Sequence, residues 1–200
     1  MKKSSVLVVI DVQNDFCPGG RLAVAGGHET VPLINTMMQD FAHVVLTQDW
    51  HPADHSSFAS QHAGSAAFTS VEMPYGPQTL WPDHCIIGSD GAAFHGALDV
   101  TKAELIIRKG YRKAIDSYSA FFENDHATPT GLGGYLKERG FTDVTLVGLA
   151  FDYCVRYSAE DAKTLGFNVT VVKRATRAID FGGTADATRK SFAERGIVLA

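Results

Sequence analysis

The sequence is poor in cysteine and has no long hydrophobic run. Its three cysteines, Cys17, Cys85 and Cys154, are far apart, and no two of them form a C-x-x-C pair. An odd number of widely spaced cysteines argues against a disulfide framework and favours a reducing compartment, so we expect a cytoplasmic protein. No run approaches the ~20 apolar residues of a membrane span. The short apolar run that ends at Asp11 lacks a cleavage pattern, so we expect neither a signal peptide nor a membrane partner.

An excess of basic residues is also absent. The chain has 18 Lys and Arg against 22 Asp and Glu, a net charge of −4, and the two signs are interspersed. Without a basic stripe or arm, a nucleic-acid partner is not expected. With 45% hydrophobic residues in 200, and no repeat or linker, the chain is expected to form a single domain over residues 1–200.

Six short runs rich in β-branched residues predict strands, and their near-continuous apolar character is typical of parallel strands covered on both faces. Helical patterns lie between them, and Gly140 and Gly166 follow two of these, where a helix often ends in a left-handed residue. This alternation predicts an α/β, doubly wound fold, with a six-stranded parallel sheet and helices on both faces. The predicted strands are 5–11, 43–48, 104–109, 143–149, 168–173 and 196–200, and the predicted helices are about 29–41, 130–139, 152–165 and 184–194.

Residues 50–103 show no strong period and are rich in His, Gly, Pro and Ser. A structureless connection of this length is uncommon in a compact domain and is usually functional. We therefore expect a binding loop there.

Three reactive residues follow or end predicted strands: Asp11, Lys109 and Cys154. Ligands of open α/β sheets bind at the carboxyl ends of the strands, so these three residues are expected to meet. Taken singly, each has an ordinary structural explanation, because a lone Cys is usually a buried hydrophobe and an Asp or Lys at a strand end is usually a turn residue or a solvated charge. Because all three are expected at the same edge of the sheet, nucleophilic catalysis stands as an equal alternative to a purely structural role for each residue.

The three side chains are chemically complementary. A helix N-terminus and a nearby ammonium both favour the thiolate, and a thiol pKa lowered to about 6 would make about nine-tenths of Cys154 reactive at pH 7. Asp11 would then move a proton from the thiol to a leaving group. This is nucleophilic catalysis without a catalytic histidine.

The stretch "TQDWHPADH" and the later "LWPDHC" carry metal-type ligands. Asp49 and His51 point to the same side of an extended segment, and His84 is a third His in a supporting setting. A mixed carboxylate and imidazole set suits zinc, iron or manganese. The alternative, which the residues alone leave open, is a His-rich surface loop. We expect Cys85 to be buried and structural.

Five segments together, "VVIDVQNDFCPGGRLAV", "TQDWHPADHSSF", "LWPDHC", "IIRKG" and "GLAFDYCV", resemble the bacterial nicotinamidases of the isochorismatase-like hydrolase superfamily, in matching order and spacing. The resemblance implies hydrolysis of nicotinamide to nicotinate and ammonia through a cysteine thioester, and of pyrazinamide as a further small-molecule substrate. It also implies one bound divalent metal ion (zinc, iron or manganese) that orients the pyridine ring.

The resemblance assigns a role to each site residue. Its catalytic triad is Asp11, Lys109 and Cys154, and its metal ligands are Asp49, His51 and His84, with His55 as a further candidate. It also implies a cis peptide bond between Leu149 and Ala150, an oxyanion hole from the N–H groups of Ala150 and Cys154, and ring-binding walls from Phe16, Trp81 and Tyr118.

Two departures from the family pattern bear on the pocket. Phe151 stands where a Thr is frequent, which affects the packing around the pocket but not the triad. The segment from Tyr111 to Asn124 matches loosely, so the substrate contacts it makes are open.

Two other functions stay open beside this one. A metal-free relative that hydrolyses carbamoyl or ureido amides would use the same triad but would not need three metal ligands. A non-catalytic metal or thiol sensor would explain the metal ligands and Cys154 but gives Asp11 and Lys109 no role. The metal's identity and the choice between monomer and homo-oligomer are not determined by the sequence.

Overall fold

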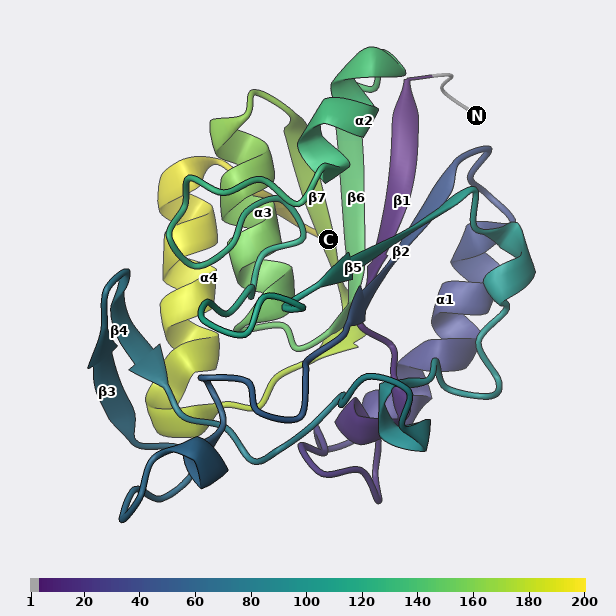
Figure 1. Ribbon diagram of the computed structural model, residues 1–200. Helices are drawn as coiled ribbons and strands as arrows, with labels where there is room; N and C mark the ends of the chain where they lie inside the picture. Colours follow the sequence, from purple (N-terminus) through teal and green to yellow (C-terminus); the bar gives the residue numbers. More distant parts are fainter. Residues whose placement is uncertain (1–3) are drawn as a thin grey trace.

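The structure is a computed structural model that describes residues 4–200. Its centre is a six-stranded parallel sheet with the strand order β5-β2-β1-β6-β7-β8 (Figure 1). This confirms the predicted fold class. The strands are β1 (Ser5–Ile10), β2 (Val44–Asp49), β5 (Leu105–Lys109), β6 (Asp143–Leu149), β7 (Asn168–Arg177) and β8 (Val198–Leu199).

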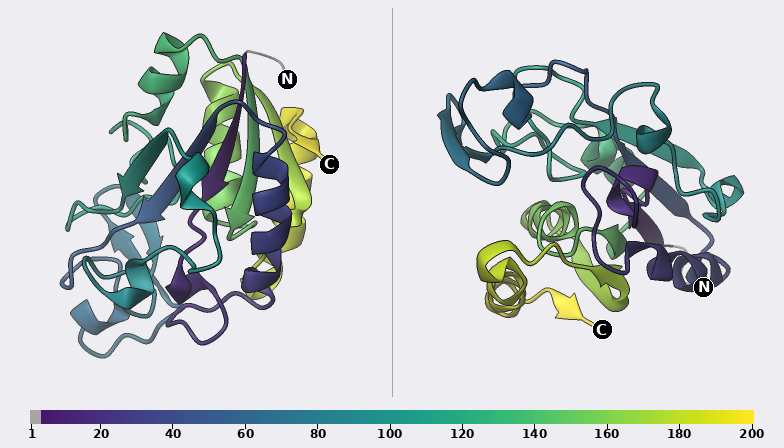
Figure 2. Two further views of the ribbon diagram at one scale, coloured as in Figure 1. Left: turned by 90° about the vertical axis from the view of Figure 1, so that its right-hand side faces the viewer. Right: turned by 90° about the horizontal axis from the view of Figure 1, so that it is seen from below.

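Helices cover both faces of the sheet, as Figure 2 shows from below. The helices are α1 (Thr30–Met38), α2 (Leu132–Glu138), α3 (Cys154–Thr164) and α4 (Thr184–Arg195). Alternate residues of β1 point to opposite faces, since successive side chains of a strand alternate. Leu7 and Val9 join the cluster with α1, whereas Val6, Val8 and Ile10 join the cluster with the other three helices. Both faces of β1 are therefore buried, as its unbroken apolar run predicts.

Glycines in the left-handed conformation follow the ends of α2, α3 and α4. Gly140 and Gly166 have φ values of 72° and 93°, as predicted, and Gly196 ends α4 in the same way with φ 63°. Helix α2 begins later than predicted, at Leu132, because Gly131 has φ 107° and is not helical. Of residues 4–200, no helix is long and apolar enough to cross a membrane.

The long segment after β2 is more ordered than its sequence predicts. It holds an antiparallel hairpin of β3 (Ser70–Met73) and β4 (Gly76–Thr79), which is seen at the lower left of Figure 1. These short strands are mostly exposed or half-buried, their one fully buried residue is the polar Gln78, and they include Pro77, so no strand pattern stands out. The segment returns to the sheet through an isolated bridge between His51 and Ile86.

The carboxyl ends of the strands gather at the lower edge of the sheet in Figure 1. Strand β1 pairs with β2 on one side and with β6 on the other, so the strand order reverses around it. Ligands of open α/β sheets bind at such a switch point. Gly148 lets β6 approach closely here, because a Cβ at this residue would overlap the Ile10 carbonyl. Asp11 follows β1 at this position.

Candidate active site

The structure brings Asp11, Lys109 and Cys154 together. Asp11 follows β1, Lys109 is the last residue of β5, and Cys154 is the first residue of α3. The Lys109 ammonium nitrogen lies 2.9 Å from Oδ2 of Asp11 and 3.5 Å from Sγ of Cys154. All three side chains are buried or nearly so. An acid, an amine and a thiol from three distant segments therefore form one cluster.

Lys109 has two further partners. Its ammonium donates to the Ser117 carbonyl oxygen at 2.9 Å and forms an ion pair with Asp49, the residue paired with it across β2 and β5. Burial opposes the charge, but the Asp11 and Asp49 carboxylates raise the pKa of Lys109 well above its usual value. Lys109 is therefore a fixed cation between two acids.

The Cys154 thiol differs from the sequence-based expectation of a lowered pKa. Burial raises its pKa well above the usual value, and Lys109 opposes this without reversing it. The nearby Asp11 carboxylate raises the pKa of the thiol further, because its negative charge and its acceptor oxygens favour the protonated sulfur. Burial likewise raises the pKa of Asp11 to about 6, against the opposing effect of Lys109. The geometry thus suits transfer of the thiol proton to Asp11 at the moment of attack, in place of a preformed thiolate.

Two backbone donors lie beside the thiol. The peptide bond between Leu149 and Ala150 is cis, at the position that the resemblance implies. Within residues 4–200, neither the Ala150 N–H nor the Cys154 N–H donates to an acceptor, whereas the neighbouring N–H groups of Tyr153 and Val155 both donate to the Ala150 carbonyl. Free N–H groups at the start of a helix are suited to a developing negative charge.

Asp49, His51 and His84 form a buried cluster whose ligand atoms lie within 4.8 Å of one another. The two imidazole Nε2 atoms lie 3.6 Å and 3.9 Å from Oδ2 of Asp49. Nδ1 of His51 faces the Gly110 carbonyl at 2.8 Å, and Nδ1 of His84 faces the Pro82 carbonyl at 2.8 Å. Because a carbonyl only accepts, each Nδ1 carries a hydrogen, so Nε2 is the atom that a neutral imidazole offers to a cation. These residues fit a divalent cation.

Charges and burial tune the same cluster. Burial would raise the pKa of Asp49, but Lys109 and His51 hold it well below its usual range. Burial lowers the pKa of His84 to about 4, helped by His51. A neutral imidazole beside an ionised carboxylate is the protonation state that metal ligation requires.

His55 is buried and its ring lies 4.4 Å from that of His51. Its ligand atom also lies within 4.8 Å of those of His51 and Asp116. However, Nε2 of His55 faces the Ile115 carbonyl at 3.2 Å, and its Nδ1 accepts from the Ser57 N–H at 3.2 Å. With both ring nitrogens occupied, His55 has no lone pair turned to the cluster of Asp49, His51 and His84.

A cavity joins the thiol cluster to the metal-type cluster. Phe16, Trp81 and Tyr118 line it together with Cys154, as the resemblance implies. The Trp81 ring packs edge-on against Tyr153 at 4.9 Å, and its Nε1 donates to the Tyr118 hydroxyl at 3.1 Å. The cavity has four further lining residues that the sequence analysis did not identify: Leu22, Asp116, Tyr153 and Ile179. Of these four residues, only Tyr153 could have been found from the sequence, because it directly precedes Cys154.

Phe151 does not line this cavity. Its fully buried ring packs edge-on against Phe192 of α4, with centroids 5.8 Å apart, and the Lys173 ammonium lies 4.4 Å above it. The loosely matching segment from Tyr111 to Asn124, in contrast, supplies Asp116 and Tyr118 to the cavity wall and the Ser117 carbonyl to Lys109.

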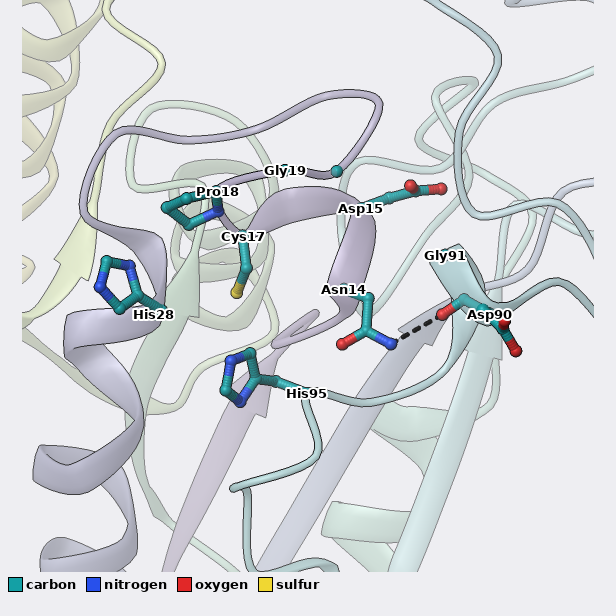
Figure 3. A pocket seen from close by; sticks show the side chains of 10 residues that line it. Asn14, Asp15, Cys17, Pro18, Gly19, His28, Asp90, Gly91 and His95 are labelled. Atoms are coloured by element: carbon teal, nitrogen blue, oxygen red, sulfur yellow. Dashed lines mark hydrogen bonds between the residues drawn. The ribbon is translucent and has the colours of Figure 1, made fainter.

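A second, more open cavity lies on the other side of the turn at Asn14–Phe16 (Figure 3). Cys17, His28 and His95 line it, but no group of metal-type ligands within 4.8 Å in residues 4–200 includes them. Burial raises the pKa of the Cys17 thiol, so it is not activated. The residue preceding Cys17 lines the first cavity, so this turn separates the two.

Comparison with known proteins places the chain in a family. The isochorismatase domain model matches residues 5–199. The nicotinamidase of Acinetobacter baylyi is 53% identical over 178 residues, which cover 89% of this chain and 83% of that protein. A nicotinamidase and pyrazinamidase structure from Acinetobacter baumanii has a TM-score of 0.98 at 49% identity and covers 100% of this chain and 96% of its own. The pyrazinamidase of Pyrococcus horikoshii in complex with zinc has a TM-score of 0.80 at 30% identity and covers 98% of each chain. The chain therefore belongs to the isochorismatase family and, within it, groups with the nicotinamidases.

Proposed function

We propose that the protein hydrolyses nicotinamide to nicotinate and ammonia, with Cys154 as the nucleophile. The observation that carries this proposal is the shared cavity, in which the Cys154 thiol and three metal-type ligands face one aromatic-walled space. The names of the relatives support the same substrate class. Pyrazinamide, another ring carboxamide, is expected to be hydrolysed as well.

The first half-reaction begins with proton transfer. Asp11 takes the thiol proton as the sulfur attacks the carboxamide carbon. Lys109, which contacts both side chains, stabilises the negative charge as it passes from Asp11 to the sulfur. The carbonyl oxygen becomes an oxyanion beside the free N–H groups of Ala150 and Cys154. A donor of this kind typically lowers the barrier by about 3 kcal/mol. When the C–N bond breaks, Asp11 returns the proton to the nitrogen, ammonia leaves, and a thioester remains.

The second half-reaction reverses these roles. Asp11 is a carboxylate again and takes a proton from water, whose oxygen attacks the thioester carbon. The C–S bond breaks, and the proton on Asp11 passes to the sulfur. The product is released as nicotinate after its carboxylic acid loses the second proton of the water to solvent, and the enzyme returns to its starting protonation state.

Asp49, His51 and His84 are proposed to hold one divalent cation, zinc, iron or manganese. When bound, the cation supplies a Lewis acid for the pyridine nitrogen and for water. The protein's own contribution is to fix the two imidazoles on the Gly110 and Pro82 carbonyls and to face the cavity with ring-binding side chains. A ring held between Phe16 and Trp81 turns its carboxamide toward Cys154.

The experiment that tests the proposal is ammonia release from nicotinamide by the purified protein, before and after treatment with a chelator. Cys154→Ala is the negative control, and Cys17→Ala, at a thiol outside the catalytic cavity, is the matched positive control. Release that needs Cys154, stops with chelator and returns with zinc is the expected result. Absence of release from the metal-loaded protein would refute the proposed activity.

The same assay separates the two alternatives. Chelator-resistant release from carbamoyl or ureido amides, with none from nicotinamide, would identify a metal-free amidohydrolase. Zinc binding without turnover of either substrate class would identify a sensor. A single domain over residues 1–200 belongs to this proposal. So does a cytoplasmic location, which is supported by the three cysteines, all of them free.

A further inference from the structure

Asp15 is a buried carboxylate that the proposed reaction does not use. It lies in the 3-10 turn Asn14–Phe16 and is 5% exposed. Figure 3 shows its carboxylate pointing away from Cys17 and the two imidazoles of the second cavity. One oxygen accepts from the Arg21 N–H at 3.0 Å, and the other accepts from the Cys85 N–H at 2.7 Å. The Asp15 side chain thus links its own loop to Cys85, which lies 70 residues further along the chain.

The partner residue Cys85 has an unusual backbone conformation. Its φ of 46° lies in the left-handed region, which is unfavourable for a residue with a side chain. Its N–H is held by Asp15, and its carbonyl accepts from the His51 N–H at 3.0 Å. Cys85 directly follows His84. The backbone at Cys85 therefore connects two of the three metal-type ligands, and Asp15 holds it from the other side.

Two glycines make room for Asp15. A Cβ on Gly91 would overlap the carboxylate atoms of Asp15, and a Cβ on Gly20 would overlap its backbone. The site is therefore built around Asp15 from both loops, and a methyl group at Gly91 would displace the carboxylate without changing its chemistry.

We propose that Asp15 is a positioning residue of the metal site: its carboxylate holds Cys85 in the left-handed conformation and so fixes His84 relative to His51. The inference rests on the proposed metal site of Asp49, His51 and His84. It predicts that Asp15 controls metal affinity, although its side chain does not belong to the ligand cluster. Loss of residues that orient metal ligands typically lowers metal affinity by about 10- to 100-fold.

The test measures zinc affinity by competition with a chromophoric chelator and, in parallel, thermal unfolding of the zinc-free protein. Asp15→Ala is expected to bind zinc at least about tenfold more weakly. Asp15→Asn keeps one oxygen that can accept the Cys85 N–H, so most of the affinity is expected to return. Asp90→Ala is the matched control, because Asp90 is an exposed carboxylate in the neighbouring loop whose side chain makes no hydrogen bond within residues 4–200.

Gly91→Ala gives an independent reading if Asp15→Ala fails to fold, since it is expected to weaken zinc binding to a similar extent with Asp15 intact. Folded Asp15→Ala and Gly91→Ala variants that bind zinc as tightly as the parent, whatever their melting temperatures, would overturn the inference and leave the proposed function standing. A parent protein that binds no zinc would overturn the metal site itself, and this inference with it. The two failures are therefore distinguishable.

Discussion

Asp49 and Lys109 are paired directly across β2 and β5, and their side chains form a buried ion pair. The same Lys109 ammonium lies 2.9 Å from Asp11. One cation therefore stands between the carboxylate of the metal-type cluster and the carboxylate beside the thiol. This arrangement couples the two halves of the candidate site, because neither acid can lose its partner without affecting the other.

Lys109→Met is expected to destabilise the protein and to abolish ammonia release. Removing the ammonium leaves two buried carboxylates without a counter-charge, and breaking a buried ion pair in this way typically costs about 3–5 kcal/mol. Urea unfolding measures the loss. The double variant Asp49→Asn/Lys109→Met removes one of the two charges, so part of the stability is expected to return while activity stays absent. Equal stability of Lys109→Met and the parent would show that the cation does not stabilise these acids.

The convergence of Asp11, Lys109 and Cys154 was predictable from the sequence because it depends on topology. Asp11, Lys109 and Cys154 follow or end strands whose apolar runs are clear, and parallel strands bring their carboxyl ends together. The metal-type ligands were visible for a similar reason, since an extended segment places Asp49 and His51 on one side.

What the sequence did not show depends on burial and on irregular backbone. The raised pKa of Cys154 results from desolvation, which is not visible in a motif. Asp116 reaches the cavity from a segment without helix or strand, so no period indicated its position. The link from Asp15 to Cys85 joins two loops through one hydrogen bond, and no spacing rule predicts such a contact.

The pH dependence of kcat/KM should report the raised pKa of Asp11. In the proposed reaction Asp11 must be ionised to accept the thiol proton, so activity is lost as the pH falls through its pKa of about 6. Below that value kcat/KM is expected to fall by about tenfold for each pH unit, and above it to level off. Initial rates between pH 4.5 and 8 measure this, with circular dichroism to establish that the protein stays folded. A flat profile across pH 6 would contradict the role of Asp11 as the base.

His51 and His55 are adjacent imidazoles for which opposite results are expected. His51→Ala removes a nitrogen that faces Asp49, so the proposed zinc binding should be lost. His55→Ala removes a ring whose two nitrogens already bond Ile115 and Ser57, so zinc should be retained. Elemental analysis of the purified variants measures both, with His62→Ala, at a residue outside the cavity, as the control. Zinc loss in His55→Ala would add this residue to the ligand set.

Phe151→Thr should affect stability and not substrate binding. The Phe151 ring is fully buried against Phe192 and does not line the catalytic cavity, so truncation leaves a void in the core behind α4. Large-to-small changes of this kind typically cost about 3 kcal/mol or more. The KM for nicotinamide is expected to stay within about twofold of the parent value, because the cavity walls do not change. Denaturant unfolding and steady-state kinetics measure the two effects separately. A large change in KM at unchanged stability would mean that the residue acts on the pocket, as its departure from the family pattern first indicated.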